Sequence, residues 1–222
     1  MRVRLHSATP LTTLAYAIRF SHSSHDRSDS SEDGLGSADL RLIRSVIGKG
    51  HDSVLEHVTY QFTINGISRL VLQELARHRM ASMVVKSSRY TLNELKKIDF
   101  GNPPFTRTAL EKASRFVNFV YWKVPSKEAS AMDEDIMLSL IALQNHLKAG
   151  VKPDQAKYLL PESYKTDLFW TINARSMRNF LKLRLARDAH FEIRELAGLV
   201  FQSIPQDHHI LYDEIINFNG KN

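Results

Sequence analysis

The sequence predicts an α+β fold with a central, mostly antiparallel sheet flanked by long helices. Short stretches of alternating hydrophobic residues, typical of strands, occur at 2–7, 57–64 and 166–171. Long stretches with helical spacing separate them, and no internal repeat or domain-separating linker interrupts the 222 residues. We therefore expect a single domain spanning residues 1–222.

The first half of the chain alternates between the two element types. Val3 and Leu5 alternate with polar residues, which predicts a strand over 2–7. Residues 21–36 are rich in Ser, Asp, His and Gly, so we expect an exposed loop there. The elements expected up to residue 79 are a strand over 2–7, helices over 10–20 and 38–47, a strand over 57–64 and a helix over 68–79, for which Ser68 is the candidate cap.

The second half is predicted to be mainly helical. The apolar run Met83-Val84-Val85 fits a short strand, and Gly101–Phe105 forms a proline-rich turn. The remaining expected elements are helices over 107–123 and 127–148, a short helix from Pro153 that ends before Pro161, a strand over 166–171, and helices over 175–187, 189–203 and 207–217.

Composition excludes several classes of function. Hydrophobic residues make up 43% of the chain, and no apolar run approaches the roughly 18 residues that a membrane span needs. The N-terminus lacks the apolar stretch of a signal peptide, so we expect a cytoplasmic protein. The absence of cysteine removes disulfides, thiolate metal sites and cysteine nucleophiles.

The net charge of +6 and the pI of about 9.5 favour anionic partners. A basic nucleic-acid-binding module is one interpretation, but most basic residues are spread along amphipathic helices. We find no aromatic-interleaved basic motif and no helix-turn-helix or glycine-rich RNA-binding signature. His51 and His57 have a spacing that metal sites use, but no third ligand is clear. We therefore expect neither a nucleic-acid partner nor a metal.

The densest group of polar side chains lies in residues 77–90. It begins with Arg77-His78-Arg79 and ends with Ser87-Ser88-Arg89-Tyr90, with Ser82 between them. A basic residue at the end of a helix is favoured by the helix dipole, which explains one of these cations but not the whole group. Guanidinium groups and hydroxyls together supply many donors, so the segment suits a doubly charged anion.

Three further segments carry candidate functional residues, and each also has a purely structural interpretation. Ser53 can cap a turn, Lys157 can be an exposed helix residue, and Ser176 can cap a helix. Glu74, one helical turn before Arg77, can form an ion pair within its helix. The segments read His51-x-Ser53-x-x-Glu56-His57, Asp154-x-x-Lys157-x-x-x-Pro161, and Asn173-Ala174-Arg175 continuing to Arg184.

Together these four segments resemble the motifs of the flavin-dependent thymidylate synthase family. The resemblance implies reductive methylation of dUMP to dTMP, with FAD reduced by NADPH and the carbon supplied by 5,10-methylenetetrahydrofolate. Members of this family need no enzyme cysteine nucleophile, so the absence of cysteine is compatible with it. The resemblance also implies a homotetramer whose active sites are shared between subunits.

The resemblance assigns roles to residues by position. It implies that Arg184 is catalytic and favours ionisation of the uracil at N3. The FAD-binding positions are His51, Ser53, Arg77, His78, Arg79, Val85, Asn173, Ala174, Arg175 and Asn179. The dUMP-binding positions are Glu74, Arg77, Val85, Ser87, Ser88, Arg89, Lys157 and Arg184, of which Ser87, Ser88 and Arg89 would hold the phosphate.

The sequence departs from the family pattern at four positions. Glu74 replaces the usual glutamine, Lys157 replaces an arginine, and Val84 and Val85 replace an Asn-Glu pair. A valine side chain accepts no hydrogen bond, so Val85 would contact flavin and nucleotide through its backbone. These departures leave open a relative that binds FAD and nucleotide without synthase activity.

Overall fold

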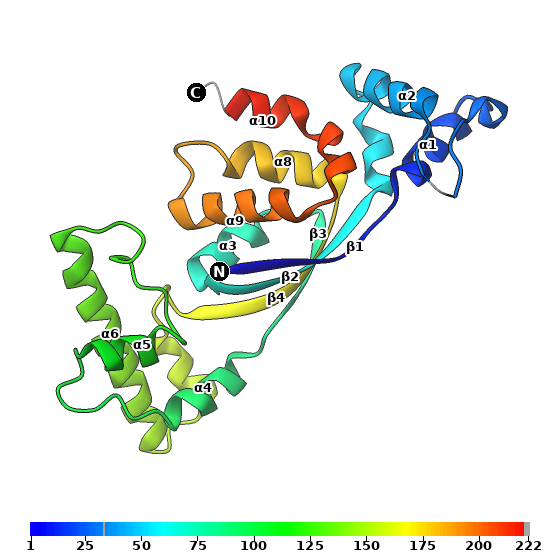
Figure 1. The fold of residues 1–222 in the computed structure, drawn as a ribbon. Coiled ribbons are helices and arrows are strands. Elements are labelled where there is room, and N and C mark those ends of the chain that lie inside the picture. Colours follow the sequence, from blue (N-terminus) through cyan, green and yellow to red (C-terminus); the bar gives the residue numbers. More distant parts are fainter. Residues whose placement is uncertain (33, 220–222) are drawn as a thin grey trace. The chain divides into compact units, whose positions relative to one another are not determined.

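The computed structural model, which describes residues 1–32 and 34–219, contains a four-stranded antiparallel sheet with the strand order β1-β2-β4-β3 (Figure 1). The strands are β1 Arg2–Ala8, β2 Thr59–Ser68, β3 Ala81–Val85 and β4 Lys165–Asn173. All four predicted strands are present; β2 begins two residues later and ends four residues later than predicted, and β4 extends beyond both of its predicted limits. The predicted α+β class is confirmed.

Internal contacts divide the chain into two compact units. Unit 1 comprises the described residues of Met1–Ile64, Ala76–Val84 and Leu168–Asn222, and unit 2 comprises Asn65–Leu75 and Val85–Asp167. The chain passes between the units four times, so no single linker marks a boundary in the sequence. The single domain expected over 1–222 stays a prediction.

Unit 1 contains the α-helices that follow β1 and β4. Its core includes Trp170 of β4, whose ring centroid lies 6.0 Å from that of Phe62 and 5.1 Å from that of Phe180. Helix α9 packs against both β1 and α8 (Figure 1). The helices are α1 Leu11–Phe20, α2 Ser37–Gly48, α8 Ala174–Arg184, α9 Phe191–Ser203 and α10 Asp213–Asn219, with short 3-10 helices η1 His25–Arg27, η2 Asp52–His57 and η4 Gln206–Leu211.

Helix α8 begins at the end of β4 and carries several candidate site residues. The side chain of Asn173 accepts a hydrogen bond from the backbone N–H of Ser176 at 2.8 Å and so caps the helix. The expectation that Ser176 is the cap is wrong, because Ser176 lies in the first turn. Met177, Phe180 and Leu181 of α8 are buried. The polar residues of this helix therefore lie on its opposite side.

The loop between α1 and α2 is mostly exposed, as predicted. Its ends are held by a buried ion pair in which Arg19 Nε donates to Asp39 Oδ1 at 2.5 Å. Ser28 and Ser30 each donate a hydroxyl hydrogen bond of 2.6 Å to the other oxygen of Asp39. A buried carboxylate requires such partners, and here they come from the polar loop itself.

Unit 2 is built around the long helix α6, Lys127–Lys148, which begins and ends where the sequence predicts. Helices α4, α5 and α7 pack against it. The other helices are α3 Arg69–Ala76, α4 Ser88–Lys96, α5 Arg107–Ala113, α7 Pro153–Ala156 and the 3-10 helix η3 Lys157–Leu159. The core contains Leu92, Leu95, Phe116, Val117, Met137, Leu140, Leu143 and Tyr164.

Several predicted helix limits are wrong for identifiable reasons. Ser68 caps α3 as expected, with its hydroxyl accepting from the Val71 N–H at 3.2 Å, but the helix ends at Ala76 rather than residue 79. Helix α5 ends at Ala113 rather than 123, because Val117 forms a β-bridge with Tyr164. Helix α4 was not predicted at all.

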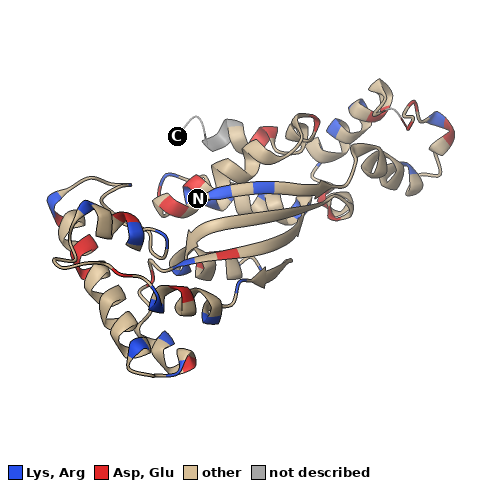
Figure 2. Ribbon diagram, turned by 60° about the horizontal axis from the view of Figure 1, so that its bottom comes forward, with Lys and Arg blue, Asp and Glu red and all other residues tan. Residues whose placement is uncertain are grey.

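Charged residues of both signs are distributed over both units. Figure 2 shows Lys and Arg interspersed with Asp and Glu in both units, rather than a continuous basic stripe, over the part of the chain that is described. No helix among the described residues is long and apolar enough to cross a membrane.

Candidate active site

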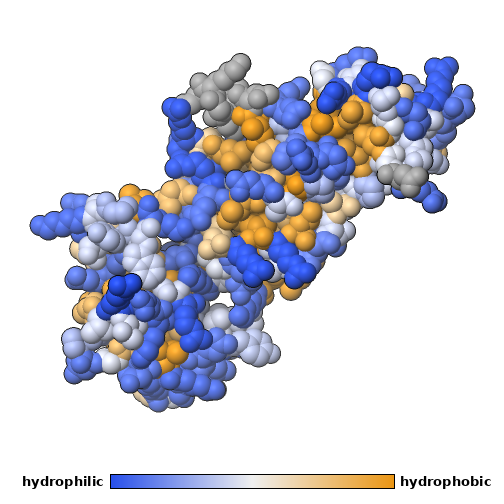
Figure 3. Space-filling view, viewed as in Figure 1, coloured by the Kyte–Doolittle hydropathy of each residue, from blue (hydrophilic) through white to orange (hydrophobic). Residues whose placement is uncertain are grey.

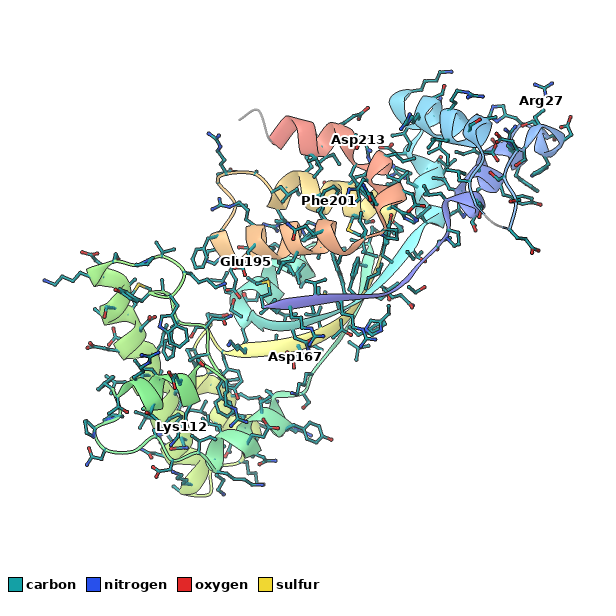
Figure 4. All side chains as sticks on the ribbon, in the orientation of Figure 1. Arg27, Lys112, Asp167, Glu195, Phe201 and Asp213 are labelled. Atoms are coloured by element: carbon teal, nitrogen blue, oxygen red, sulfur yellow. The ribbon has the colours of Figure 1, made fainter. Side chains whose placement is uncertain are left out.

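Unit 1 contains a cavity of about 680 Å³. Its walls come from η2, from residues 77–80 and from one side of α8 and the start of α10, which Asp213 marks in Figure 4. Five lining side chains are cations and three are carboxylates, so the cavity suits an anionic ligand with hydrogen-bond donors. The lining residues are Asp52, Glu56, Arg77, His78, Arg79, Met80, Asn173, Arg175, Ser176, Arg178, Asn179, Lys182, Glu214 and Ile215.

The short connection between α3 and β3 places the Arg-His-Arg motif in this wall. Because α3 ends at Ala76 and β3 begins at Ala81, only residues 77–80 join them. All three residues line the cavity, but their exposure differs. His78 is buried, whereas Arg77 and Arg79 are exposed. The two arginines are therefore available to a ligand, whereas the histidine is largely enclosed by the protein.

His78 forms a hydrogen bond with the candidate catalytic arginine. Arg184 Nε donates to His78 Nε2 at 3.1 Å, and the His78 ring meets the Phe180 ring edge-on at 5.2 Å between centroids. Burial and, to a smaller extent, the positive charge of Arg184 together lower the pKa of His78 to about 4. His78 is thus neutral near pH 7 and accepts through Nε2, which orients Arg184.

Replacing His78 with Gln is expected to reduce the loss of stability in acid. Between pH 6.5 and 4 the unfolded chain protonates His78 and the folded protein does not, so the free energy of unfolding falls as the pH drops. Glutamine does not titrate, so the decrease between pH 7 and pH 4 should shrink by on the order of 2 kcal/mol. Urea unfolding at a series of pH values measures it.

The exposed His22 provides the matched control for this experiment. His22→Gln makes the same substitution at an exposed position, so it shows how much of the change in His78→Gln comes from the burial of His78. An acid dependence that is the same in His78→Gln and the wild type would contradict the buried, neutral state of His78.

The η2 segment contributes two carboxylates with different surroundings. Glu56 Oε1 accepts from Arg175 Nη1 at 2.5 Å, an ion pair that joins η2 to α8. Asp52 Oδ1 is buried and has no hydrogen-bond partner among the described residues, although it lies in the cavity wall. An orphaned buried carboxylate oxygen is costly, and a donor on a bound molecule would satisfy it.

Arg178 ties α8 to the C-terminal segment. One terminal nitrogen donates to the carbonyl of Leu211, and the other donates to Glu214 Oε2 at 3.2 Å. These bonds hold Glu214 and Ile215 in the cavity wall. No pattern in the sequence indicates this contact, because the partners lie more than 30 positions apart.

A second cationic group lies in unit 2, at the start of α4. Ser87 caps α4, with its hydroxyl accepting from the Arg89 N–H at 3.4 Å. Lys86, the residue before Ser87, donates its backbone N–H to the carbonyl oxygen of Asp167 at 2.8 Å. Asp167 is labelled in Figure 4. The N-terminus of α4, two serine hydroxyls and the Arg89 guanidinium are groups whose chemistry suits an anion.

Arg89 and Lys157 share one carboxylate, that of Asp154. Arg89 donates through Nε to Oδ1 at 3.1 Å and through Nη2 to Oδ2 at 2.8 Å, and Lys157 Nζ lies 3.1 Å from Oδ1. The hydrogen bond from Arg89 is the main cause that lowers the pKa of Asp154, followed by that from Lys157. The same bond raises the pKa of Arg89.

The residues expected to form the site therefore fall into three groups. Six line the unit 1 cavity: Arg77, His78, Arg79, Asn173, Arg175 and Asn179. Four more lie in unit 1 outside the lining: His51, Ser53, Ala174 and Arg184. Six belong to unit 2: Glu74, Val85, Ser87, Ser88, Arg89 and Lys157. No cluster of potential metal ligands occurs among the described residues.

Comparisons with known proteins agree with the motifs. A family model described as thymidylate synthase complementing protein matches residues 3–208. The flavin-dependent thymidylate synthase of Wolinella succinogenes is 45% identical over 213 residues, which cover 96% of this chain and 97% of that protein. The enzyme of the same name from Helicobacter pylori strain 26695 is 43% identical over 218 residues, covering 97% of this chain and 99% of that protein.

The fold is also similar to that of solved structures. A crystal structure of Thymidylate Synthase X from Helicobacter pylori with FAD and dUMP superimposes with a TM-score of 0.86 at 41% identity, covering 97% of this chain and 99% of that one. A second structure of the Helicobacter pylori protein, complexed with FAD and dUMP, gives a TM-score of 0.85 at 42% identity.

Proposed function

Because this chain belongs to the flavin-dependent thymidylate synthase family, we propose that it methylates dUMP reductively to dTMP with FAD as its cofactor. NADPH supplies the reducing equivalents and 5,10-methylenetetrahydrofolate supplies the carbon, leaving tetrahydrofolate. The observation that carries the proposal is the agreement, over nearly the whole chain, with a structure that contains FAD and dUMP.

The unit 1 cavity supports binding of the flavin cofactor. Arg77 and Arg79 are exposed in its wall and suit the pyrophosphate, because guanidinium groups bind phosphate oxygens in pairs. The orphaned Oδ1 of Asp52 suits a hydroxyl or amine donor of the same molecule. Asn173, Arg175 and Asn179 complete the polar wall. FAD, when bound, supplies the redox chemistry, and the protein supplies binding, orientation and charge.

Arg184 is the residue that we assign to activation of the uracil. A fixed cation beside the ring favours loss of the N3 proton and pushes electron density toward C5. His78 fixes the guanidinium by accepting from Nε, and His78 stays neutral because it is buried. Arg184 therefore meets the substrate as an oriented, permanently charged group.

The start of α4 supports binding of the dUMP phosphate. Ser87 and Ser88 offer hydroxyls, Arg89 offers its guanidinium, and the helix N-terminus favours negative charge. Lys157 is joined to Arg89 through Asp154 and adds a second cation. Three of the departures from the family pattern, Glu74, Val84 and Val85, lie outside this group of phosphate donors, and Lys157 keeps the positive charge of the arginine that it replaces.

Val84 and Val85 belong to β3, which accounts for valine at both positions. Both side chains are exposed. Their backbone groups are the only polar atoms that they offer, so we assign contacts of Val85 with flavin and nucleotide to its N–H and C=O.

We also propose a homotetramer with shared active sites that works in the cytoplasm. Large apolar side chains are exposed in unit 1, among them Tyr16 and Phe20 of α1, Met80 and Leu183. Figure 3 shows hydrophobic areas on the surface of this unit. Exposed apolar groups of this size are typical of surfaces that bind another chain.

Titration with FAD provides a first test of this proposal. The purified protein is expected to be yellow, or to gain flavin absorbance on addition of FAD, and to oxidise NADPH when dUMP is present. A colourless protein that gains no flavin absorbance would contradict the proposal.

A further inference from the structure

The carboxylate of Asp154 binds both cations of the proposed phosphate site in unit 2. We propose that Asp154 is a positioning residue for the dUMP phosphate, which orients Arg89 and Lys157 without touching the substrate. This inference rests on the proposed function, because it assumes that the start of α4 binds dUMP.

The geometry of the Arg89–Asp154 pair leaves room for a phosphate. The carboxylate is bound by Nε at 3.1 Å and by Nη2 at 2.8 Å, which lie on one edge of the planar guanidinium. The second edge, formed by Nη1 and Nη2, is not used by Asp154. A guanidinium has five N–H donors in a fixed plane, so Arg89 can hold the carboxylate and a phosphate on different edges.

Asp154 also brings together two cations that are far apart in the sequence. Arg89 lies on α4, and Lys157 lies at the start of η3, 3.1 Å from the same carboxylate. Without a shared anion these side chains would be mobile, since both are solvent-exposed to a considerable degree, 65% and 35%. Binding of a dianion would then have to order two long side chains, which costs conformational entropy. Because Asp154 already orders both side chains before the ligand binds, this cost of binding is smaller.

If Asp154 instead competed with the dUMP phosphate for Arg89 and Lys157, the KM for dUMP would change in the opposite direction. A carboxylate that occupied the phosphate position would have to leave before dUMP could bind, and its removal would tighten binding. The contact through the Nε edge favours the positioning role, because the end of the guanidinium remains available for phosphate. The direction of the change in KM therefore decides between the two roles.

The test compares Asp154→Asn with the wild-type holoenzyme in steady-state assays with varied dUMP. Asparagine keeps the size of the side chain but loses its charge. We expect the KM for dUMP to rise about fivefold, as suits an exposed charge network, while kcat and flavin content stay within about twofold. Asp154→Glu keeps the carboxylate and should restore most of the loss.

Glu111→Gln is the matched control, because Glu111 forms an exposed ion pair with Arg107 in the same unit. Its KM for dUMP should equal that of the wild type. A KM that is unchanged or lower in Asp154→Asn would overturn the inference, and so would a loss that Asp154→Glu fails to restore. If the wild-type protein itself failed to turn over dUMP, the proposed function would be refuted instead.

Discussion

The Arg184→Ala variant is expected to lose about 100-fold or more of its turnover while it retains bound FAD. Removing a single preorganised group that stabilises developing charge typically costs two to three orders of magnitude in rate, about 3–4 kcal/mol. Arg184 lies at the last turn of α8, outside the residues that line the cavity, and is held by His78, which does line it. Single-turnover assays and flavin absorbance measure the two quantities separately.

The neighbouring Arg187 is exposed and serves as the control for this variant. Arg187→Ala removes the same charge three positions later and should retain nearly full turnover. Arg184→Lys keeps the charge but loses the planar group, so its turnover should lie between that of the wild type and Arg184→Ala. Equal losses of flavin and activity in Arg184→Ala would indicate a structural role instead.

The Arg89→Ala variant is expected to raise the KM for dUMP about 30-fold, with a smaller effect on kcat. Hydrogen bonds between charged groups contribute more than neutral ones, and Arg89 is the only arginine that we assign to the phosphate. The variant also removes the bidentate contact between Arg89 and Asp154. Lys157 then remains as the ion-pair partner of Asp154 among the described residues. Initial rates with varied dUMP measure the change.

Arg107 is a suitable control for Arg89, because it is an exposed arginine of unit 2 that pairs with Glu111. Arg107→Ala should leave the KM for dUMP unchanged. A normal KM in Arg89→Ala would place the phosphate elsewhere.

The sequence predicted those elements whose signals are local. Helix α6 begins at a capping serine, Ser126, and carries a long hydrophobic pattern, so both of its limits were predicted correctly. Helix α5 was predicted ten residues too long, because its end depends on the bridge between Val117 and Tyr164, 47 positions away. Helix α4 was missed because the segment that begins at its cap, Ser87, was interpreted only through its anion-binding side chains.

The site residues, too, could be predicted only where the signal was local in the sequence. The motif spacing identified Arg77, His78 and Arg79, which line the cavity. It did not identify Arg178 and Glu214, because their place in the wall depends on the packing of α8 against α10. Asp52 was also missed, although it stands between two expected residues, since only burial shows that one of its oxygens has no partner.

The most direct test of the central claim is the formation of dTMP from dUMP by the purified protein. We predict that dTMP appears when FAD, NADPH and 5,10-methylenetetrahydrofolate are all present, and that omitting any one of them abolishes it. A protein that binds FAD fully but forms no dTMP from dUMP under these conditions would contradict the account.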